Sequence, residues 1–319
     1  MRVLVSGGAG FLGSAILQEL NERGRTDLIV VDDIDHLEKE KNLASIKHSE
    51  LIGKHAFLDK VLNHSLRPIE AIIHMGACSS TIEMDENFLT KNNYDYTRRL
   101  ATCALEKDIR FIYASSAAVY GTDTKFSDLA ATQTPLNVYG YSKWLFDQYV
   151  LQKLPKINSP VIGLRYFNVY GPNESHKNVM ASVAYHLHQQ LKEGKELELF
   201  DGSGGYKAGE QRRDFIYVDD VVKVNLWFMQ NPDISGIFNV GTGKSQTFNE
   251  VANSVIEFHG KGSIKYIPFP KELIDSYQSF TEANIERLRE AGYLEDFLDV
   301  QSGIELYLRK LHNWPKNEN

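Results

Sequence analysis

The sequence is poor in cysteine and has no long apolar run. Cys78 and Cys103 are the only cysteines among 319 residues, which fits neither a disulfide framework nor a metal knuckle and indicates a reducing compartment. No stretch approaches the ~18 apolar residues of a membrane span, so we expect a cytoplasmic protein with neither anchor nor signal peptide. The ten histidines lack paired spacing such as HExxH, which predicts no metal site.

Basic residues are also in the minority. The chain has 42 acidic and 35 basic residues, for a formal net charge of -7. The average field of such a protein repels nucleic acid and anionic membranes, so we expect neither as a partner. Any anionic ligand must therefore be held by a local binding site.

The first half of the chain alternates short β-branched runs with longer amphipathic segments. The runs lack the apolar–polar alternation of half-exposed strands, which indicates strands covered on both faces. This pattern predicts an α/β fold with a doubly wound parallel sheet and helices on both faces. The expected strands are 2–6, 28–32, 71–75, 111–115 and 160–167, and the expected helices lie near 11–23, 83–106 and 139–153.

A glycine triplet follows the first expected strand and opens the first expected helix. Gly7, Gly10 and Gly13 have the spacing that lets the backbone turn sharply and approach a pyrophosphate, while the helix N-terminus supplies free N–H groups. Asp32 ends the second strand roughly 20 residues further on, where a ribose-binding acid is expected. The arrangement predicts a Rossmann dinucleotide site. Asp32 and Asp33 favour NAD, whereas Lys39 or Lys41 would suit the 2′-phosphate of NADP.

The sequence changes character after Phe167. The pattern predicts a helix over 179–194, a strand at 196–200, a return to the sheet through 214–229 and 236–243, and a last helix near 299–313. We therefore expect a dinucleotide-binding domain at 1–167 with a return segment at about 214–241. The segments 168–213 and 242–319 are expected to form a smaller α/β substrate-binding domain.

Two tyrosines and a lysine stand at the start of the helix near 139–153. Residues four apart share a helix face, so Tyr139 and Lys143 point together and Tyr141 points about 200° away. A phenol with a pKa near ~10 needs about 4 kcal/mol of help to act as a base at neutral pH. An ammonium at ~4 Å supplies about that much at an effective dielectric near 20, and an oxidised nicotinamide adds a second positive charge. We therefore expect Lys143 to activate Tyr139, with Ser115 or Ser116 holding the reacting oxygen.

These residues carry a family resemblance. The glycine loop, "SSAAVYG", "YGYSK" and "LRYFNVYGP" together resemble the extended short-chain dehydrogenase/reductase superfamily, which favours Ser116 over Ser115. Further motifs, among them "HMGACSST", "RRDFIYVDDV" and "GIFNVGTG", closely resemble the ADP-L-glycero-D-manno-heptose 6-epimerase family, nearly from Arg2 to Leu311.

The resemblance implies an activity. The family inverts the 6-position of ADP-glycero-manno-heptose through transient oxidation and re-reduction by a tightly bound nicotinamide, and supplies ADP-L-glycero-D-manno-heptose for the lipopolysaccharide core. Two faces of one carbon imply two proton-transfer groups, Tyr139 and Lys177, with Lys143 and Ser116 completing the catalytic set. Lys39 matches the family's lysine near the 2′-phosphate, so NADP is expected, with NAD open. The family also implies a homo-oligomer such as a pentameric ring.

Binding residues follow by position in the matched motifs. The cofactor set is Gly7, Gly10, Phe11, Leu12, Gly13, Asp32, Asp33, Lys39, Lys54, Met75, Gly76, Ala77, Cys78, Ser79, Asn92, Lys143, Val169 and Lys177. The set for the nucleotide-sugar is Asn168, Val179, His186, Phe200, Asp201, Gly202, Ser203, Arg213 and Tyr277. Arg213 also has a physical reason, because a guanidinium fork suits a diphosphate in an acidic protein.

Other functions of the same fold are weaker alternatives. A nucleotide-sugar 4-epimerase or a reductase keeps the same Tyr139 and Lys143 pair, and only its substrate region differs. A 4,6-dehydratase requires an acidic pair where Ala117 and Ala118 stand. A non-enzymatic dinucleotide sensor typically loses the tyrosine–lysine pair, which this chain retains.

Overall fold

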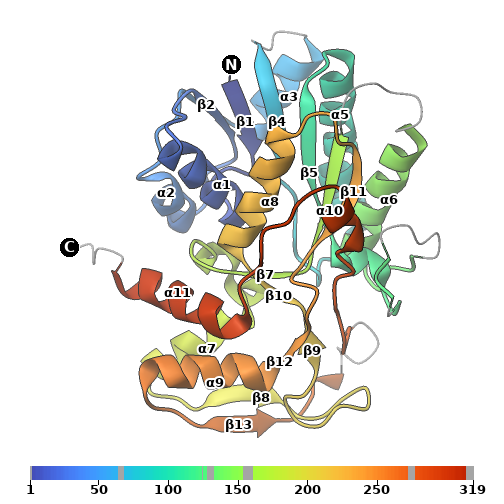
Figure 1. Ribbon diagram of the computed structural model, residues 1–319. Helices are drawn as coiled ribbons and strands as arrows, with labels where there is room; N and C mark the ends of the chain where they lie inside the picture. Colours follow the sequence, from blue (N-terminus) through green and yellow to red (C-terminus); the bar gives the residue numbers. More distant parts are fainter. Residues whose placement is uncertain are drawn as a thin grey trace.

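A seven-stranded parallel sheet forms the larger part of the protein (Figure 1). The computed structural model describes residues 2–63, 68–123, 125–127, 133–153, 161–271 and 277–313. The strand order is β11-β6-β5-β4-β1-β2-β3, so the predicted doubly wound fold is confirmed. The strands are β1 (Arg2–Ser6), β2 (Leu28–Val31), β3 (Glu50–Ile52), β4 (Ile69–His74), β5 (Arg110–Ser116), β6 (Val161–Tyr166) and β11 (Gly236–Val240).

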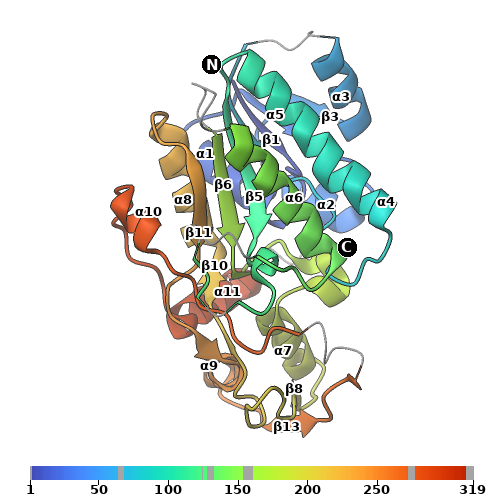
Figure 2. The same cartoon turned by 90° about the vertical axis from the view of Figure 1, so that its right-hand side faces the viewer.

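Helices cover both faces of the sheet (Figures 1 and 2). Alternate side chains of β1 pack into hydrophobic cores on opposite faces of the sheet. Val3 and Val5 lie on the face covered by α1 (Phe11–Glu22) and α8 (Val218–Gln230). Leu4 packs on the opposite side, which is covered by α3 (Lys54–Leu62), α5 (Tyr96–Glu106) and α6 (Val138–Lys153). Burial on both faces explains why the strands lack alternation in sequence. Among the described helices, none combines the length and apolar character needed to cross a bilayer.

The strand order reverses beside β1, and this reversal determines where a ligand-binding crevice forms. The chain leaves β1 toward β2 on one side and later continues from β4 on the other. Loops at the carboxyl ends of such neighbouring strands diverge and leave a crevice, which is where doubly wound folds bind ligands. Here the two loops are tied together at their start, because the Met75 N–H donates to the Ser6 carbonyl at 2.9 Å.

A second lobe lies below the carboxyl edge of the sheet (Figures 1 and 2). Its helices are α7 (Val183–Lys192), α9 (Phe248–His259) and α11 (Val300–Asn313). Its strand pairs are β7 (Asn168–Tyr170) with β10 (Phe215–Tyr217), β8 (Leu197–Phe200) with β13 (Ile264–Ile267), and β9 (Arg212–Arg213) with β12 (Gln246–Thr247). The short helices α2 (Leu37–Leu43) and α10 (Glu286–Glu290) lie against the larger lobe. The predicted domain boundaries stay a prediction.

Three expected elements differ from the structure. The helix over 179–194 begins only at Val183, because Asn178 has φ 49° and Ser182 caps α7 by accepting from the Tyr185 N–H. The helix over 83–106 is interrupted between α4 (Glu86–Leu89) and α5 by a π-helical turn at Thr90–Asp95. The segment 214–229 does not return to the main sheet, since its strand β10 pairs with β7. The second expected return segment does join the sheet, as β11 beside β6.

Candidate active site

The loop after β1 forms a cradle that has no room for side chains. Gly7 has φ 68°, and a Cβ there would lie 2.5 Å from the Gly76 backbone nitrogen. A Cβ on Gly13 would lie 2.1 Å from the Gly7 carbonyl oxygen. Gly10 caps α1 without a side chain, so the N–H groups of the first turn remain available. These features fit a dinucleotide pyrophosphate held on the helix N-terminus.

Carboxylates and lysines lie beyond this cradle, at the end of β2. Asp32 accepts from the Ala9 N–H at 2.9 Å, and the Lys39 ammonium lies 3.2 Å from Asp32 and 2.8 Å from Asp35. Burial disfavours the ammonium, but the bonds to Asp35 and Asp32 outweigh it and raise the pKa of Lys39. Lys54 lies 3.6 Å from Asp33. The ribose end of the cradle therefore holds paired charges of both signs.

Buried polar groups fix the loop after β4. Asn93, 2% exposed, accepts from the Cys78 N–H at 2.9 Å and donates to the Cys78 carbonyl at 2.9 Å and to the Ser142 hydroxyl at 3.0 Å. Asn93 lies in the π-helical turn, a feature frequent at functional sites. His74 bonds Ser6 and Thr97, and burial, with the charge of Lys143, lowers its pKa to about 3. His74 is therefore a neutral structural residue.

Tyr139 and Tyr141 have opposite environments. Tyr139 is buried at the start of α6 and hydrogen-bonds Ser116, whereas Tyr141 is 52% exposed and stacks on Trp144. Lys143 is buried, with its ammonium 6.0 Å from the centre of the Tyr139 ring. The Ser115 hydroxyl points elsewhere and donates to Asp147 at 2.9 Å. The structure thus brings Tyr139, Ser116 and Lys143 together.

The expected activation of the Tyr139 phenol by Lys143 stays a prediction. Burial raises the pKa of Tyr139, although the Ser116 hydrogen bond lowers it in part. The Lys143 ammonium donates to the Ala114 carbonyl at 2.9 Å, and burial lowers its pKa to about 8. Desolvation is the largest cause of the pKa shift of both groups. Tyr139 is therefore a neutral phenol at pH 7.

A buried ion pair lies directly behind this group. Arg165 and Asp147 are both fully buried and 2.8 Å apart. Asp147 also accepts from the Tyr113 hydroxyl at 2.8 Å, and Arg165 donates to the Tyr120 hydroxyl at 3.0 Å. Because Asp147 follows Lys143 by one helical turn, the pair fixes α6 against β5 and β6 at the level of the site. Its charge also opposes the loss of the Lys143 proton.

Lys177 enters the same cavity from the second lobe. Its ammonium lies 5.3 Å from the centre of the Phe11 ring, and burial lowers the pKa of Lys177 while Glu174 raises it. Glu174 is fully buried and accepts from the Ser182 N–H at 2.6 Å and the Tyr307 hydroxyl at 3.0 Å. This carboxylate anchors the segment that carries Lys177 to both α7 and α11.

All the catalytic and cofactor residues expected from sequence line one cavity of about 710 Å³. It runs from Asp32 and Lys39 past the glycine cradle to Tyr139, Lys143 and Lys177. None of the nine residues expected to bind the nucleotide-sugar lies in its lining. The structure therefore separates the two predicted sets, one between the sheet and the second lobe and the other within the second lobe.

Arg213 lies at the centre of the second set. Its guanidinium is buried, 4.7 Å from the centre of the Tyr277 ring and 5.9 Å from that of Phe248, and burial lowers its pKa. In the ranges that the structure describes, no carboxylate forms an ion pair with it. Arg212, by contrast, donates to Ser245. An uncompensated buried cation favours an anionic ligand.

The other residues expected to bind the nucleotide-sugar differ in their burial and contacts. Phe200 makes an edge-on ring contact with Phe269, which in turn makes one with Tyr277. Gln211 holds the loop at 201–203 by donating to the Asp201 carbonyl and the Ser203 hydroxyl. Gly202 shares that loop. Asn168 accepts from Thr281 at 3.4 Å, His186 is half-buried on α7 and Val179 is 75% exposed. Their role in binding stays a prediction.

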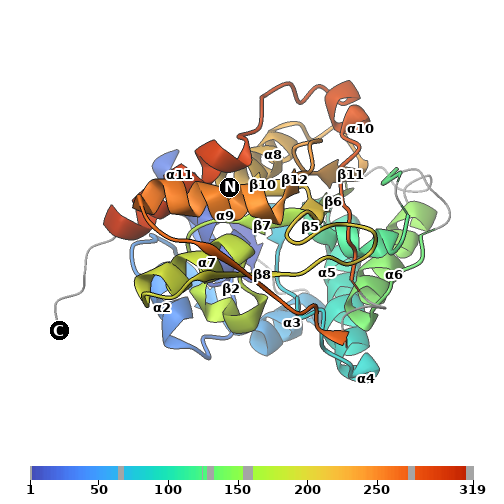
Figure 3. The same ribbon diagram turned by 90° about the horizontal axis from the view of Figure 1, so that it is seen from below.

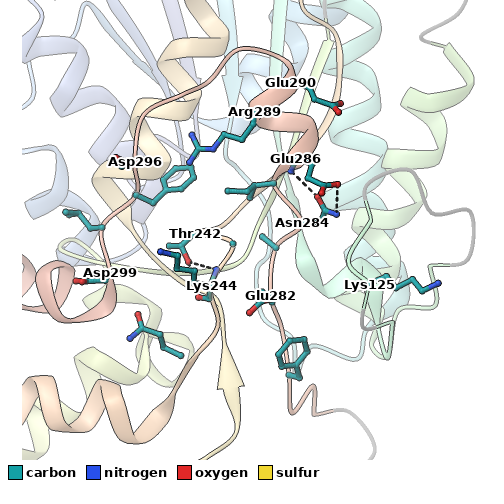
Figure 4. Close-up of a pocket in the computed structure, with 17 residues that line it drawn as sticks. Lys125, Thr242, Lys244, Glu282, Asn284, Glu286, Arg289, Glu290, Asp296 and Asp299 are labelled. Carbon is teal, nitrogen blue, oxygen red and sulfur yellow. Dashed lines mark hydrogen bonds between the residues drawn. The ribbon is translucent and has the colours of Figure 1, made fainter.

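A larger cavity of about 890 Å³ lies elsewhere (Figure 4). Charged side chains surround it, among them Lys244, Glu282, Glu286, Arg289 and Asp299. None of the expected catalytic, cofactor or nucleotide-sugar residues lines it, so size alone does not identify the candidate active site.

Comparison with known families agrees with the geometry. The family model described as "NAD dependent epimerase/dehydratase family" matches residues 3–241. The chain belongs to this family. The match covers every strand of the main sheet and the tyrosine–lysine helix α6, so this family member is an epimerase-type enzyme with a dinucleotide site.

Individual relatives are similar along the whole chain. The protein is 48% identical over 314 residues to ADP-L-glycero-D-manno-heptose-6-epimerase from Alkalilimnicola ehrlichii, with 98% of each chain covered. The Helicobacter pylori structure of that name has a TM-score of 0.86 at 32% identity, covering 98% of this chain and 96% of that one. UDP-glucose 4-epimerase from Thermotoga maritima, with UDP-glucose, has a TM-score of 0.79 at 26% identity, covering 98% and 99%. The resemblance drawn from the motifs is confirmed.

Three buried polar residues that motif matching did not single out shape the site of this family member. Asn93 fixes the loop after β4, Asp147 holds α6, and Glu174 holds the Lys177 segment. For Asn93 the sequence does contain a signal. Two adjacent asparagines, which are poor helix formers, stand at 92 and 93 inside an otherwise helical pattern. Asp147 pairs with Arg165 and Glu174 bonds Tyr307, and because these partners lie on other elements they leave no local pattern.

Proposed function

We propose that the protein is an ADP-L-glycero-D-manno-heptose 6-epimerase that inverts the 6-position of the heptose with a bound nicotinamide cofactor. The observation that carries the proposal is that two groups suited to proton transfer, Tyr139 and Lys177, line one dinucleotide-type cavity from different lobes. The 48% identity to a relative of that name supports the choice of substrate.

Inversion at one carbon requires a proton carrier for each of the two faces. Tyr139 is a neutral phenol that can donate to the substrate oxygen, with Ser116 holding that oxygen in place. Burial lowers the pKa of Lys177, which favours the neutral amine, the form that accepts a proton. Tyr139 and Lys177 can thus exchange protons with the substrate from different lobes, with Lys143 beside the Tyr139 ring.

The residues present fit a nicotinamide dinucleotide. The glycine cradle would hold the pyrophosphate, Asp32 and Lys39 the adenosine ribose, and the loop at 75–79 with Lys143 the nicotinamide end. When bound, the nicotinamide supplies the oxidising and reducing equivalents for the sugar carbon. Arg213, beside Tyr277, would hold the diphosphate of the sugar nucleotide.

A competition between two substrates tests this function. The purified protein is incubated separately with ADP-D-glycero-D-manno-heptose and UDP-galactose, and the products are followed by NMR. We expect inversion at carbon 6 of the heptose with no net change in cofactor, and no 4-epimerisation of the galactose. Inversion of UDP-galactose alone would assign the protein to the 4-epimerases, and consumption of reduced cofactor would make it a reductase.

The finer choice of NADP over NAD depends on Lys39. A charge-assisted hydrogen bond contributes about 1.5–3 kcal/mol, so Lys39→Ala should weaken binding of NADP by roughly 10–100-fold and that of NAD much less. The nucleotide released on denaturation is identified by mass spectrometry, and we expect NADP from the unmodified protein and a shift to NAD in the variant. Lys41→Ala, exposed on the same helix α2, is the matched control. Equal loss of both nucleotides would make Lys39 a structural partner of Asp32 and Asp35.

The biological setting belongs to the same proposal. The product would supply the heptose of the lipopolysaccharide core, in the cytoplasm where nucleotide-sugars are made. Assembly as a homo-oligomeric ring is supported by the resemblance to the heptose 6-epimerase family.

A further inference from the structure

Three histidines from three helices meet in the second lobe. His188 lies on α7, His259 is the last residue of α9, and His312 lies in the last turn of α11. One ring nitrogen of each lies within 4.8 Å of those of the other two, and His188 Nδ1 is 3.0 Å from His259 Nε2. None of the three lines the nucleotide cavity.

The packing of the helices fixes this meeting point. Helix α9 packs against both α7 and α11 (Figures 1 and 3). His188 is only 2% exposed, His259 is half-buried and His312 is exposed, so the cluster opens to solvent on one side. The ring planes are tilted by 33°, 61° and 83° to one another. Tilted rings direct their edges, which carry the nitrogens, toward a common point.

The charge state of the cluster suits metal ligation. Burial, with the charges of His259, Lys192 and His312, lowers the pKa of His188 to about 4. Burial also lowers the pKa of His259, with contributions from His312, Lys261 and Lys192. A lowered pKa favours the neutral imidazole, which keeps the lone pair that binds a metal. The two lysines oppose any cation, so only an ion that forms strong bonds to nitrogen can occupy this position.

We propose that His188, His259 and His312 bind one divalent transition-metal ion of the zinc class, with water as the fourth ligand. The donor set contains three imidazole nitrogens and no carboxylate, which excludes oxygen-seeking Mg²⁺ and Ca²⁺ and suits Zn²⁺, Co²⁺ or Ni²⁺. Zinc–nitrogen bonds of about 2.0–2.1 Å in a tetrahedron put the nitrogens about 3.4 Å apart. His188 and His259 are already this close, and the exposed His312 ring must move by about 1.4 Å at most.

A bound ion would join the helices that support the substrate lobe. Helix α7 starts at Ser182, which bonds Glu174, and α11 carries Tyr307, which bonds the same carboxylate. The site therefore has a structural role and is independent of the proposed catalytic function. The sequence predicts no metal site, whereas this proposal includes one. The three ligands at 188, 259 and 312 are far apart in sequence and form no local motif.

Zinc binding to the tag-free full chain tests the site. The protein is stripped of metal and titrated with ZnCl₂ in a calorimeter, and we expect one equivalent per chain and a rise in Tm of roughly 3–6 °C at a hundredfold excess over Kd. His259→Gln and His312→Gln are expected to weaken binding by at least about tenfold each. These two ligands are used because replacing the buried His188 could disturb packing. The matched control is His55→Gln, on the exposed side of α3, which should bind zinc normally.

Cobalt gives a second readout that does not depend on activity. Co²⁺ in place of zinc should show the strong visible absorption of a tetrahedral complex, and His259→Gln should abolish it. The proposal is overturned if no zinc binds, if both variants bind zinc as tightly as the unmodified protein, or if cobalt gives only the weak bands of an octahedral complex.

Discussion

Tyr139→Phe is expected to lower kcat for epimerisation by roughly 10²–10⁴-fold, the range that a positioned proton donor contributes. The substitution removes one hydroxyl from a buried ring that bonds Ser116 and leaves the glycine cradle, Lys143 and the ion pair behind α6 in place. The variant should therefore still bind its nucleotide. The measurement combines the NMR rate with the amount of nucleotide released on denaturation.

The chain offers a matched control for this experiment. Tyr141 lies two residues away on the same helix but is 52% exposed, so Tyr141→Phe should keep full activity. Near-normal turnover in Tyr139→Phe would remove Tyr139 from the mechanism. Loss of nucleotide together with activity would instead give it a role in cofactor binding.

Lys177→Met is expected to abolish inversion to a similar extent, roughly 10²–10⁴-fold, without loss of stability. Burial lowers the pKa of Lys177 in the folded protein, so the unfolded chain binds more protons at this residue. The lysine therefore costs stability at pH values below its ordinary pKa, and this cost disappears as pH rises above that pKa. Methionine keeps the contact with Phe11 and removes the cost. We expect the Tm of the variant at pH 7 to equal or exceed that of the unmodified protein.

Lys195→Met is the control for Lys177→Met. Its side chain is 66% exposed and pairs with Glu193 on the surface, so the same chemical change should leave turnover intact. Full activity in Lys177→Met would show that Lys177 takes no part in proton transfer. A lower Tm would show instead that the ammonium stabilises its segment.

The nucleotide end of the site could be predicted because its information is local. Gly7, Gly10 and Gly13 form a continuous loop between a strand and a helix, and Tyr139 and Lys143 are one helical turn apart. Each pattern fixes its own backbone geometry, so the sheet order only has to bring the loops to one edge. That is why the expected cofactor and catalytic residues line a single cavity.

The rest depends on tertiary contacts that no local pattern encodes. Helix α7 begins later than the sequence predicts, because Ser182 bonds Glu174 and caps the helix instead of lying in its interior. The raised pKa of Tyr139 could not be predicted, because the burial that causes it comes from elements far away in sequence. The residues expected to bind the sugar lie in short strands and loops, where a motif gives identity but not geometry.

The bond between Tyr307 and Glu174 spans 133 residues, and this separation affects how the protein is made. Domains fold progressively as the chain leaves the ribosome, N-terminal parts first. The sheet can therefore collapse around its nucleotide loop early, while the Glu174 anchor of the Lys177 segment lacks its bond to α11 until that helix has been synthesised. A nascent chain acquires the ability to hold a dinucleotide before it acquires the ability to use one.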